Sequence, residues 1–167
     1  MAEDGRELYF QSCEFDASKA SPWVEENVIN HLVECRGGSR LYHDLNLRVE
    51  KRRCMGTKLA VGCPWRTREQ IKTEILAFMD IETYGKPELW GWCSGYDWVA
   101  FCQIFGTMMD LPKGYPHYIK DLQHILDERG ISDDELPKQE EGLHNALQDA
   151  LHLKRLWGYI VRNDCWQ

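Results

Sequence analysis

The sequence predicts an α/β protein, chiefly from one strand-turn-helix stretch near its middle. Leu89–Cys93 is short, apolar and rich in tryptophan, and Lys86 and Pro87 bound it upstream, so it is predicted to be a buried strand. Ser94-Gly95 then breaks the strand. Beyond it, large apolar residues recur at helical spacing, which predicts a helix buried in the core: Trp98, Phe101, Cys102 and Phe105.

Asp97 stands where the predicted strand gives way to this helix. A charge at such a place is costly unless something pairs with it. One interpretation is an ordinary helix N-cap aspartate. The other is a metal ligand at the carboxyl end of a strand, where open α/β sheets place their sites. The residue alone leaves both open.

Composition points to one soluble domain spanning residues 1–167. The chain is 43% hydrophobic and 28% charged, and no apolar run suggests a membrane span or a signal peptide. Seven cysteines in irregular spacing favour reduced thiols and a cytoplasmic protein over a disulfide framework. The net charge of -7 argues against a nonspecific nucleic-acid coat. It does not exclude an enzyme that binds phosphates through metal ions.

The first elements are a turn, a strand and a helix. Asp4-Gly5 is a strong hairpin signal and Arg6–Glu14 alternates as the strand that follows, yet only residues 1–3 precede the turn. We therefore expect a hairpin that lacks its first arm. Ser21-Pro22 opens a helix whose apolar stripe comprises Val24, Val28, Ile29, Leu32 and Val33. The pattern dissolves at about 36–64, which predicts an insertion or long loop, with a possible short hairpin around Met55-Gly56.

The second half is mostly helical. Thr67 and Gln70 form a capping box for a helix with Ile71, Ile75, Phe78 and Met79 on its apolar face. A loop is expected at 111–116, then a helix over Tyr118–Arg129 that stops at Gly130, with a short strand at 117–120 as an alternative start. The polar segment 132–141 is expected to be a loop. The last helix is expected from about His144 to Val161.

His144 and Asp149 lie at the start of that last helix. Five residues apart, they would be separated by roughly 140° around a regular helix. They can share a face only if His144 sits in or before the first turn, which Gly142 makes plausible. Asp149 leans toward the buried side, where an unpaired charge is unfavourable. The plain alternative is a helix-start histidine and a surface aspartate.

Several motifs together resemble a known family. GYDW before an apolar helix and HNALQDA near the end resemble the second and third motifs of the DEDDh 3′-5′ exonucleases. The resemblance is closest to a bacterial and phage branch, the 3′-5′ exoribonuclease type first recognised in mycobacteria. It rests on four segments in matching order, two of which contain these motifs: WRTREQI, ELWGWCSGYDWVAFCQIFG, LPKGYPHYIKDL and LPKQEEGLHNALQDA.

The resemblance implies a fold and a chemistry. The fold would be ribonuclease-H-like, with three layers, a mixed central sheet and helices on both faces. In that family four carboxylates hold two divalent cations, Mg²⁺ or Mn²⁺, roughly 4 Å apart. Carried over to this chain, Asp97 and Asp149 would be metal ligands. His144 would be the general base that takes a proton from the attacking water.

The first motif of that family does not appear at its expected place. It is an aspartate and a glutamate separated by one residue on the first strand, and Glu14-Phe15-Asp16 offers the two acids only in reversed order. The motif should lie upstream of the Asp4-Gly5 turn. Both observations lead us to expect an N-terminally truncated version of the fold.

Other candidate sites rest on residue type alone. Cys35, His43, Cys54 and Cys63 could bind zinc, although free cysteines are often simply buried. A basic run could contact an RNA backbone, although such runs are usually solvated: Arg48, Lys51, Arg52 and Arg53. Trp65, Trp90 and Trp92 could stack on bases or belong to the core.

The sequence thus predicts a metal-dependent 3′-5′ exoribonuclease acting on single-stranded RNA 3′ ends. A nucleic-acid-binding pseudo-exonuclease and a nucleotide hydrolase of the same fold are the alternatives. Whether DNA is also a substrate, and whether the chain forms a homodimer, stays open. No membrane association is expected.

Overall fold

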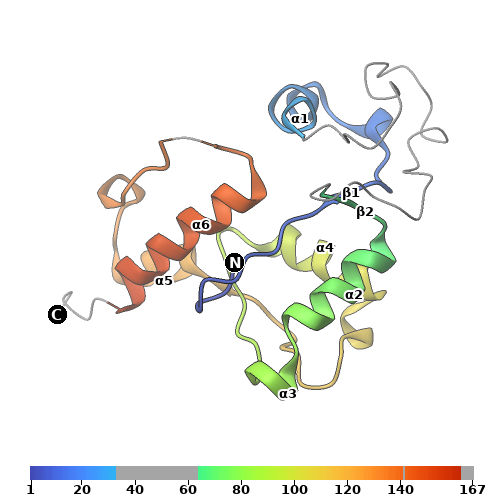
Figure 1. The fold of residues 1–167 in the computed structure, drawn as a ribbon. Coiled ribbons are helices and arrows are strands. Elements are labelled where there is room, and N and C mark those ends of the chain that lie inside the picture. Colours follow the sequence, from blue (N-terminus) through green and yellow to red (C-terminus); the bar gives the residue numbers. More distant parts are fainter. Residues whose placement is uncertain (33–63, 141, 163–167) are drawn as a thin grey trace. The chain divides into compact units, whose positions relative to one another are not determined.

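The computed structural model describes residues 1–32, 64–140 and 142–162 of the chain (Figure 1). These residues form a mixed α/β structure of helices and two small parallel sheets. The chain divides into two compact units: a larger unit of Met1–Glu7 and Ile75–Gln167, and a smaller unit of Leu8–Glu74. The insertion expected at about 36–64 falls, except for its last residue, outside the described residues. The single-domain organisation stays a prediction.

The smaller unit contains a two-stranded parallel sheet. In it β1 (Gln11–Ser12) pairs with β2 (Trp65–Arg66). Trp65 is buried and stacks on Phe15 with ring centroids 6.3 Å apart. The strand predicted over Arg6–Glu14 is therefore much shorter than expected, and its partner is distant in sequence rather than a hairpin neighbour.

Local capping chemistry sets the helix starts of the smaller unit. Helix α1 (Pro22–Asn27) begins as predicted, since the Ser21 side chain accepts a hydrogen bond from the Val24 N–H. It ends earlier than its apolar stripe suggested, and 3₁₀ turns flank it at Ala17–Lys19 and Ile29–His31. Helix α2 (Arg68–Phe78) runs from the smaller unit into the larger. The predicted capping box is confirmed, with reciprocal Thr67–Gln70 hydrogen bonds of 2.9 and 3.2 Å.

The N-terminal turn belongs to the larger unit. Gly5 adopts a φ of 95° and the Ala2 N–H donates to the Arg6 carbonyl at 2.8 Å, so the turn predicted at Asp4-Gly5 is present. The Arg6 guanidinium lies 3.6 Å from the centroid of the Tyr84 ring, a cation–π contact. Lys154 donates to the Ala2 carbonyl at 2.8 Å. These contacts attach the first residues to the rest of the unit.

The sheet of the larger unit consists of two short parallel strands. Strand β3 (Trp90–Gly91) pairs with β4 (Lys120–Asp121), with Gly91 opposite Asp121. Strand β3 confirms the predicted strand over part of its length. Strand β4 confirms in part the alternative of a strand before the helix that ends at Gly130. Because the strands are parallel, the residues that follow both of them meet at one edge of the sheet.

Helices complete the larger unit. Their bounds are α3 (Ile81–Tyr84), α4 (Gly95–Phe105), α5 (Leu122–Arg129) and α6 (Ala146–Trp157), the last continuing as a π-helical segment over Gly158–Arg162, with 3₁₀ turns at Met108–Asp110 and Asp133–Glu135. Gly130 ends α5 in the left-handed conformation, as predicted. In Figure 1, α5 and α6 lie side by side. Buried residues of both helices share one core with Leu136, which lies between them in sequence, and Ile160 of the π-helical segment: Leu122, Leu126, Leu136, Leu156 and Ile160.

Helix α4 differs from its prediction in two ways. It begins at Gly95 with Ser94 at the N-cap position, so the N-cap interpretation of Asp97 is wrong and Asp97 lies in the first turn. The helix is also not buried all round. Only Cys102 and Phe105 are buried, while Val99 is 52% exposed, because a single face of the helix packs against the unit.

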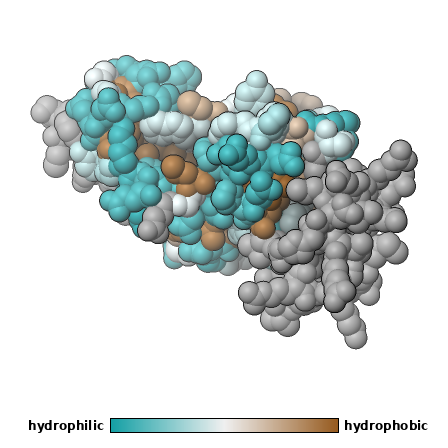
Figure 2. All heavy atoms as spheres, turned by 90° about the horizontal axis from the view of Figure 1, so that it is seen from above, coloured by the Kyte–Doolittle hydropathy of each residue, from teal (hydrophilic) through white to brown (hydrophobic). Residues whose placement is uncertain are grey.

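Apolar side chains also reach the surface elsewhere in the described part of the chain. Figure 2 shows them as separate brown patches on a mostly hydrophilic face. None of the helices formed by residues 1–32, 64–140 and 142–162 is both long and apolar enough to span a membrane.

Candidate active site

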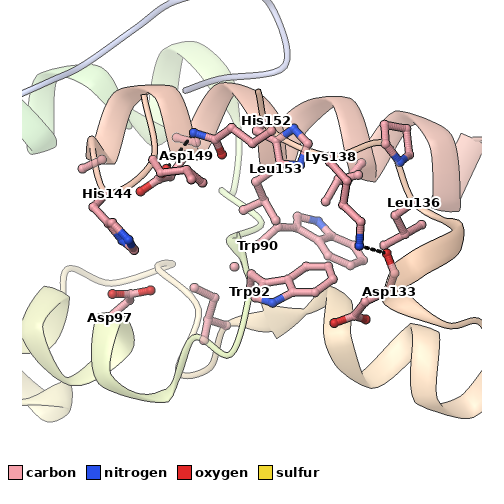
Figure 3. A pocket seen from close by; sticks show the side chains of 18 residues that line it. Trp90, Trp92, Asp97, Asp133, Leu136, Lys138, His144, Asp149, His152 and Leu153 are labelled. Atoms are coloured by element: carbon pink, nitrogen blue, oxygen red, sulfur yellow. Dashed lines mark hydrogen bonds between the residues drawn. The ribbon is translucent and has the colours of Figure 1, made fainter. Parts of the chain in front are cut away.

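A cavity of about 810 Å³ in the larger unit brings the predicted site residues together. Its polar lining comes from α4, α6 and the segment between α5 and α6 (Figure 3), and includes Asp97, Asp133, Lys138, His144, Asp149 and His152. Its apolar wall includes Trp90, Trp92, Ile119, Leu136, Leu153 and Leu156. The two acids and the histidine singled out by sequence motifs therefore line one cavity.

Asp97 projects into this cavity from the first turn of α4 (Figure 3). Its side chain still reaches solvent. Even so, partial burial raises the pKa of Asp97 above its ordinary value, and the neighbouring negative charge of Asp121 raises it further. Both effects make the ionised carboxylate unfavourable here. A positive charge placed in the cavity would stabilise it.

Asp121 is held at the end of β4 by hydrogen bonds to its carboxylate. It accepts from the Ser94 N–H at 2.7 Å, the Ser94 hydroxyl at 2.9 Å and the Cys93 N–H at 3.1 Å. The Gln123 N–H donates at 3.0 Å and makes Asp121 the N-cap of α5. Burial alone would raise the pKa of Asp121, but these hydrogen bonds outweigh burial and lower it. The carboxylate is therefore ionised at neutral pH, and protein N–H and O–H groups donate hydrogen bonds to both of its oxygens.

His144 precedes α6 and lies outside regular helix geometry. Its φ is 65°, and Asn145 is the N-cap of α6, accepting from the Leu147 N–H at 3.1 Å. Gly142 also has a positive φ, 71°, and a Cβ there would meet Gln148 at 2.7 Å, so glycine suits this turn. The helix thus begins at Ala146, two residues later than expected, and His144 meets the condition under which it and Asp149 can share a face. Figure 3 shows its ring pointing toward Asp97.

Asp149 lies in the first turn of α6 and faces the same cavity (Figure 3). Its side chain is half-buried and accepts a hydrogen bond from the Gln139 side chain at 2.9 Å. Gln139 also lines the cavity. The acid is thus oriented from the segment before α6 while one carboxylate oxygen is left for another partner.

The donor chemistry of the cavity fits hard divalent cations only in part. Asp97 and Asp149 offer carboxylate oxygens, which Mg²⁺ and Mn²⁺ prefer. Within the ranges 1–32, 64–140 and 142–162, however, no three His, Cys, Asp or Glu side chains form a group that could hold a metal ion. The residues suit a cation by type but are too few for a closed site.

Comparison with known proteins gives a consistent answer. Residues 52–161 match the family described as the 3′-5′ exoribonuclease Rv2179c-like domain. The chain is 32% identical over 164 residues to two proteins of Mycobacterium tuberculosis, 3′-5′ exoribonuclease Rv2179c of strain H37Rv and 3′-5′ exoribonuclease MT2234.1 of strain CDC 1551. Each alignment covers 98% of this chain and 82% of the relative.

The chain belongs to the Rv2179c-like 3′-5′ exoribonuclease family. The resemblance inferred from the motifs is confirmed, and with it the relationship to enzymes named 3′-5′ exoribonucleases. Within this family member, the matched region contains Asp97, His144 and Asp149, which lie at the cavity.

The other candidates of this family member are placed differently. The proposed zinc ligands Cys35, His43, Cys54 and Cys63 and the basic run Arg48, Lys51, Arg52 and Arg53 lie outside the described residues. Trp65 is 3% exposed and belongs to the core of the smaller unit. Trp90 and Trp92 pack against the core of the larger unit and also line the cavity.

The acids that might replace the first motif have local roles. In the smaller unit, Glu14 accepts from the Arg68 N–H at 2.6 Å and Asp16 accepts from the Ser18 N–H and hydroxyl. The aspartate-x-glutamate spacing does occur at Asp80 and Glu82. There Asp80 is the N-cap of α3 and Glu82 is in its first turn, not on a strand, and neither lines the cavity.

Sequence reasoning missed Asp121 and Gln139. Asp121 carried a usable signal, since it is an acid at a strand-to-helix boundary in the same way as Asp97. Two such acids on neighbouring parallel strands are expected to meet at one sheet edge. Gln139 gave no signal, because it lies in a polar segment without periodicity.

Proposed function

We propose that this chain is the catalytic domain of a metal-dependent 3′-5′ exoribonuclease that shortens single-stranded RNA from its 3′ end. The observation that carries the proposal is the meeting of Asp97, His144 and Asp149 in one cavity, although they come from separate elements. Family membership supports the reaction class. We further propose a ribonuclease-H-like sheet, of which β3 and β4 are two parallel strands.

Each site residue receives a role from its position. Asp97 and Asp149 would hold Mg²⁺ or Mn²⁺ through carboxylate oxygens, and the bound cations would activate water and stabilise the leaving 3′ oxygen. His144, at the cavity and outside the helix, would take the proton of the attacking water. Trp90 and Trp92 provide an apolar wall against which a base could lie.

The proposal requires carboxylates that the cavity does not show. Two cations close together repel one another, so two acids alone would hold them weakly. We propose that an aspartate-x-glutamate pair, introduced on two strands added before Met1, completes the set. We call a chain preceded by those two strands the extended chain.

The test follows the fate of labelled RNA. The extended chain is incubated with a single-stranded RNA carrying a 5′ label, with Mn²⁺ or with EDTA, and Asp149→Asn serves as the matched control. We expect a ladder of products shortened from the 3′ end that needs Mn²⁺ and disappears in the variant. Cleavage at internal positions, or cleavage that persists in EDTA, would contradict the proposal.

A pseudo-exonuclease is the second candidate, favoured by one specific observation. The described residues hold no group of three metal-binding side chains. Such a protein would retain RNA binding in the same cavity without shortening the strand. A gel-shift measurement on the same RNA separates the two, because the pseudo-exonuclease would bind it and return it intact. Release of phosphate from mononucleotides without RNA shortening would instead identify a nucleotide hydrolase.

A further inference from the structure

Asp121 is a charged side chain beside the cavity whose hydrogen-bonding capacity is already used. An ionised carboxylate offers about four lone-pair sites. In Asp121 one oxygen accepts from the Ser94 N–H and hydroxyl, and the other accepts from the Cys93 and Gln123 N–H groups. Asp121 is also not among the residues that line the cavity. It is therefore placed to hold protein groups rather than a metal ion or RNA.

The groups it holds form the turn between β3 and α4. Cys93 adopts a φ of 48°, a strained conformation for a residue other than glycine. Ser94 is 1% exposed, and its hydroxyl bonds to Asp121 instead of capping its own helix. The turn is also tight, since a Cβ on Gly91 would lie 2.4 Å from the Ser94 Cβ. Asp121 thus accepts hydrogen bonds from two successive backbone N–H groups of this turn, those of Cys93 and Ser94.

The position of this turn also determines where the Asp97 side chain points. The Ser94 carbonyl accepts the first helical hydrogen bond of α4, from the Trp98 N–H at 2.9 Å. Asp97 lies in that same first turn. A shift of Ser94 would therefore rotate or translate the start of α4 and move the Asp97 carboxylate within the cavity.

We propose that Asp121 is a positioning residue, which fixes Asp97 in its metal-binding place through Cys93 and Ser94. The proposal rests on the proposed function, since it takes Asp97 to be a metal ligand. Residues that orient metal ligands are commonly worth tenfold to a hundredfold in metal affinity. A capping role for α5 alone would have no such effect.

Asp121→Asn separates the positioning role from the capping role. Asparagine is as good an N-cap as aspartate, so the α5 cap at Gln123 can persist. The side-chain amide of asparagine, however, would place an N–H donor opposite the N–H and hydroxyl donors of Ser94. Asp80→Asn is the matched control: Asp80 caps α3, accepts from the Glu82 N–H and the Thr83 hydroxyl, and does not line the cavity.

The experiment titrates Mn²⁺ into the 167-residue chain and follows the paramagnetic broadening of its amide NMR signals, which detects weak binding. Wild type, Asp97→Asn, Asp121→Asn and Asp80→Asn are compared below their melting temperatures. We expect Asp97→Asn to abolish Mn²⁺ binding near α4. Asp121→Asn should weaken binding about tenfold or more, and Asp80→Asn should leave it unchanged. Ser94→Ala, which removes only one hydrogen bond, should give a smaller loss in the same direction and serves if Asp121→Asn fails to fold.

Two other outcomes overturn the inference for different reasons. If Asp97→Asn abolishes binding while Asp121→Asn and Ser94→Ala behave like Asp80→Asn, Asp97 is a ligand but Asp121 does not position it. If Asp97→Asn binds Mn²⁺ as wild type does, or wild type shows no broadening near α4, the ligand assignment itself fails and the positioning role fails with it.

Discussion

Asp97 is a carboxylate whose ionised form is unfavourable in the metal-free chain. Burial and the charge of Asp121 raise its pKa, so in the folded chain it takes up a proton at a higher pH than in the unfolded chain. The resulting destabilisation is fully present above the folded-state pKa. It decreases as the pH falls through that pKa and is absent below the unfolded value.

Asp97→Asn should therefore raise the melting temperature of the metal-free chain at neutral pH. The gain should shrink as the pH is lowered through the raised pKa of Asp97. Thermal unfolding in EDTA at a series of pH values measures this. Asp127→Asn, at an exposed acid of α5, is the control and should change stability by no more than about 0.5 kcal/mol. An unchanged or lower melting temperature for Asp97→Asn at neutral pH would show that the surroundings do not disfavour the ionised form of Asp97.

Asp149 and His144 are neighbours in the cavity with different proposed roles, which metal binding can separate. In the extended chain, Asp149→Asn and His144→Ala should each remove most RNA turnover. Only Asp149→Asn should also weaken Mn²⁺ binding in calorimetric titration, because only Asp149 is proposed as a ligand. Equal losses of Mn²⁺ affinity in the two variants would contradict the assignment of His144 as base.

At the scale of elements, the passage from β3 to α4 is a close-packed turn. A Cβ on Gly91 would meet the Ser94 Cβ at 2.4 Å and the Ile119 side chain at 3.2 Å, whereas nothing lies within 4 Å of a Cβ on Gly95. Gly91→Ala should destabilise the chain by roughly 1–3 kcal/mol through overpacking. Gly95→Ala should be neutral or slightly stabilising, because alanine favours helix over glycine. Urea unfolding compares the two, and similar stabilities for both would show that the turn has room to relax.

Elements whose ends depend on local chemistry could be predicted from sequence. The Ser21 cap, the Thr67–Gln70 capping box and the Gly130 stop all occur where their residues indicated. Strand lengths could not be predicted, because β1 and β2 pair across more than fifty residues and each forms only a two-residue ladder. The exposed face of α4 could not be predicted either, since periodicity shows which residues are apolar but not what covers them.

At the scale of the whole molecule, the site could be predicted only by adding resemblance to pattern. Spacing alone put His144 and Asp149 on different faces of a helix, and the positive φ of His144 resolves that conflict. Asp97 and Asp149 are far apart in sequence, and no local pattern joins them. The motifs of a related family did so, and both acids line the cavity.

The chain as it stands should be a poor nuclease, because the cavity shows two of the four carboxylates that the proposed mechanism uses. Removing one well-placed electrostatic group from an active site commonly costs a factor of about 10²–10³ in rate. Loss of two ligands should cost at least as much.

A side-by-side rate measurement tests this most directly. The 167-residue chain and the extended chain are assayed at equal concentration on a 3′-labelled single-stranded RNA with Mg²⁺ or Mn²⁺, and release of the labelled nucleotide is followed. The proposed two-metal site predicts release by the extended chain that is faster by a factor of at least about 100. Comparable rates from both chains would show that Asp97, Asp149 and His144 need no upstream carboxylates, and would contradict a four-carboxylate site.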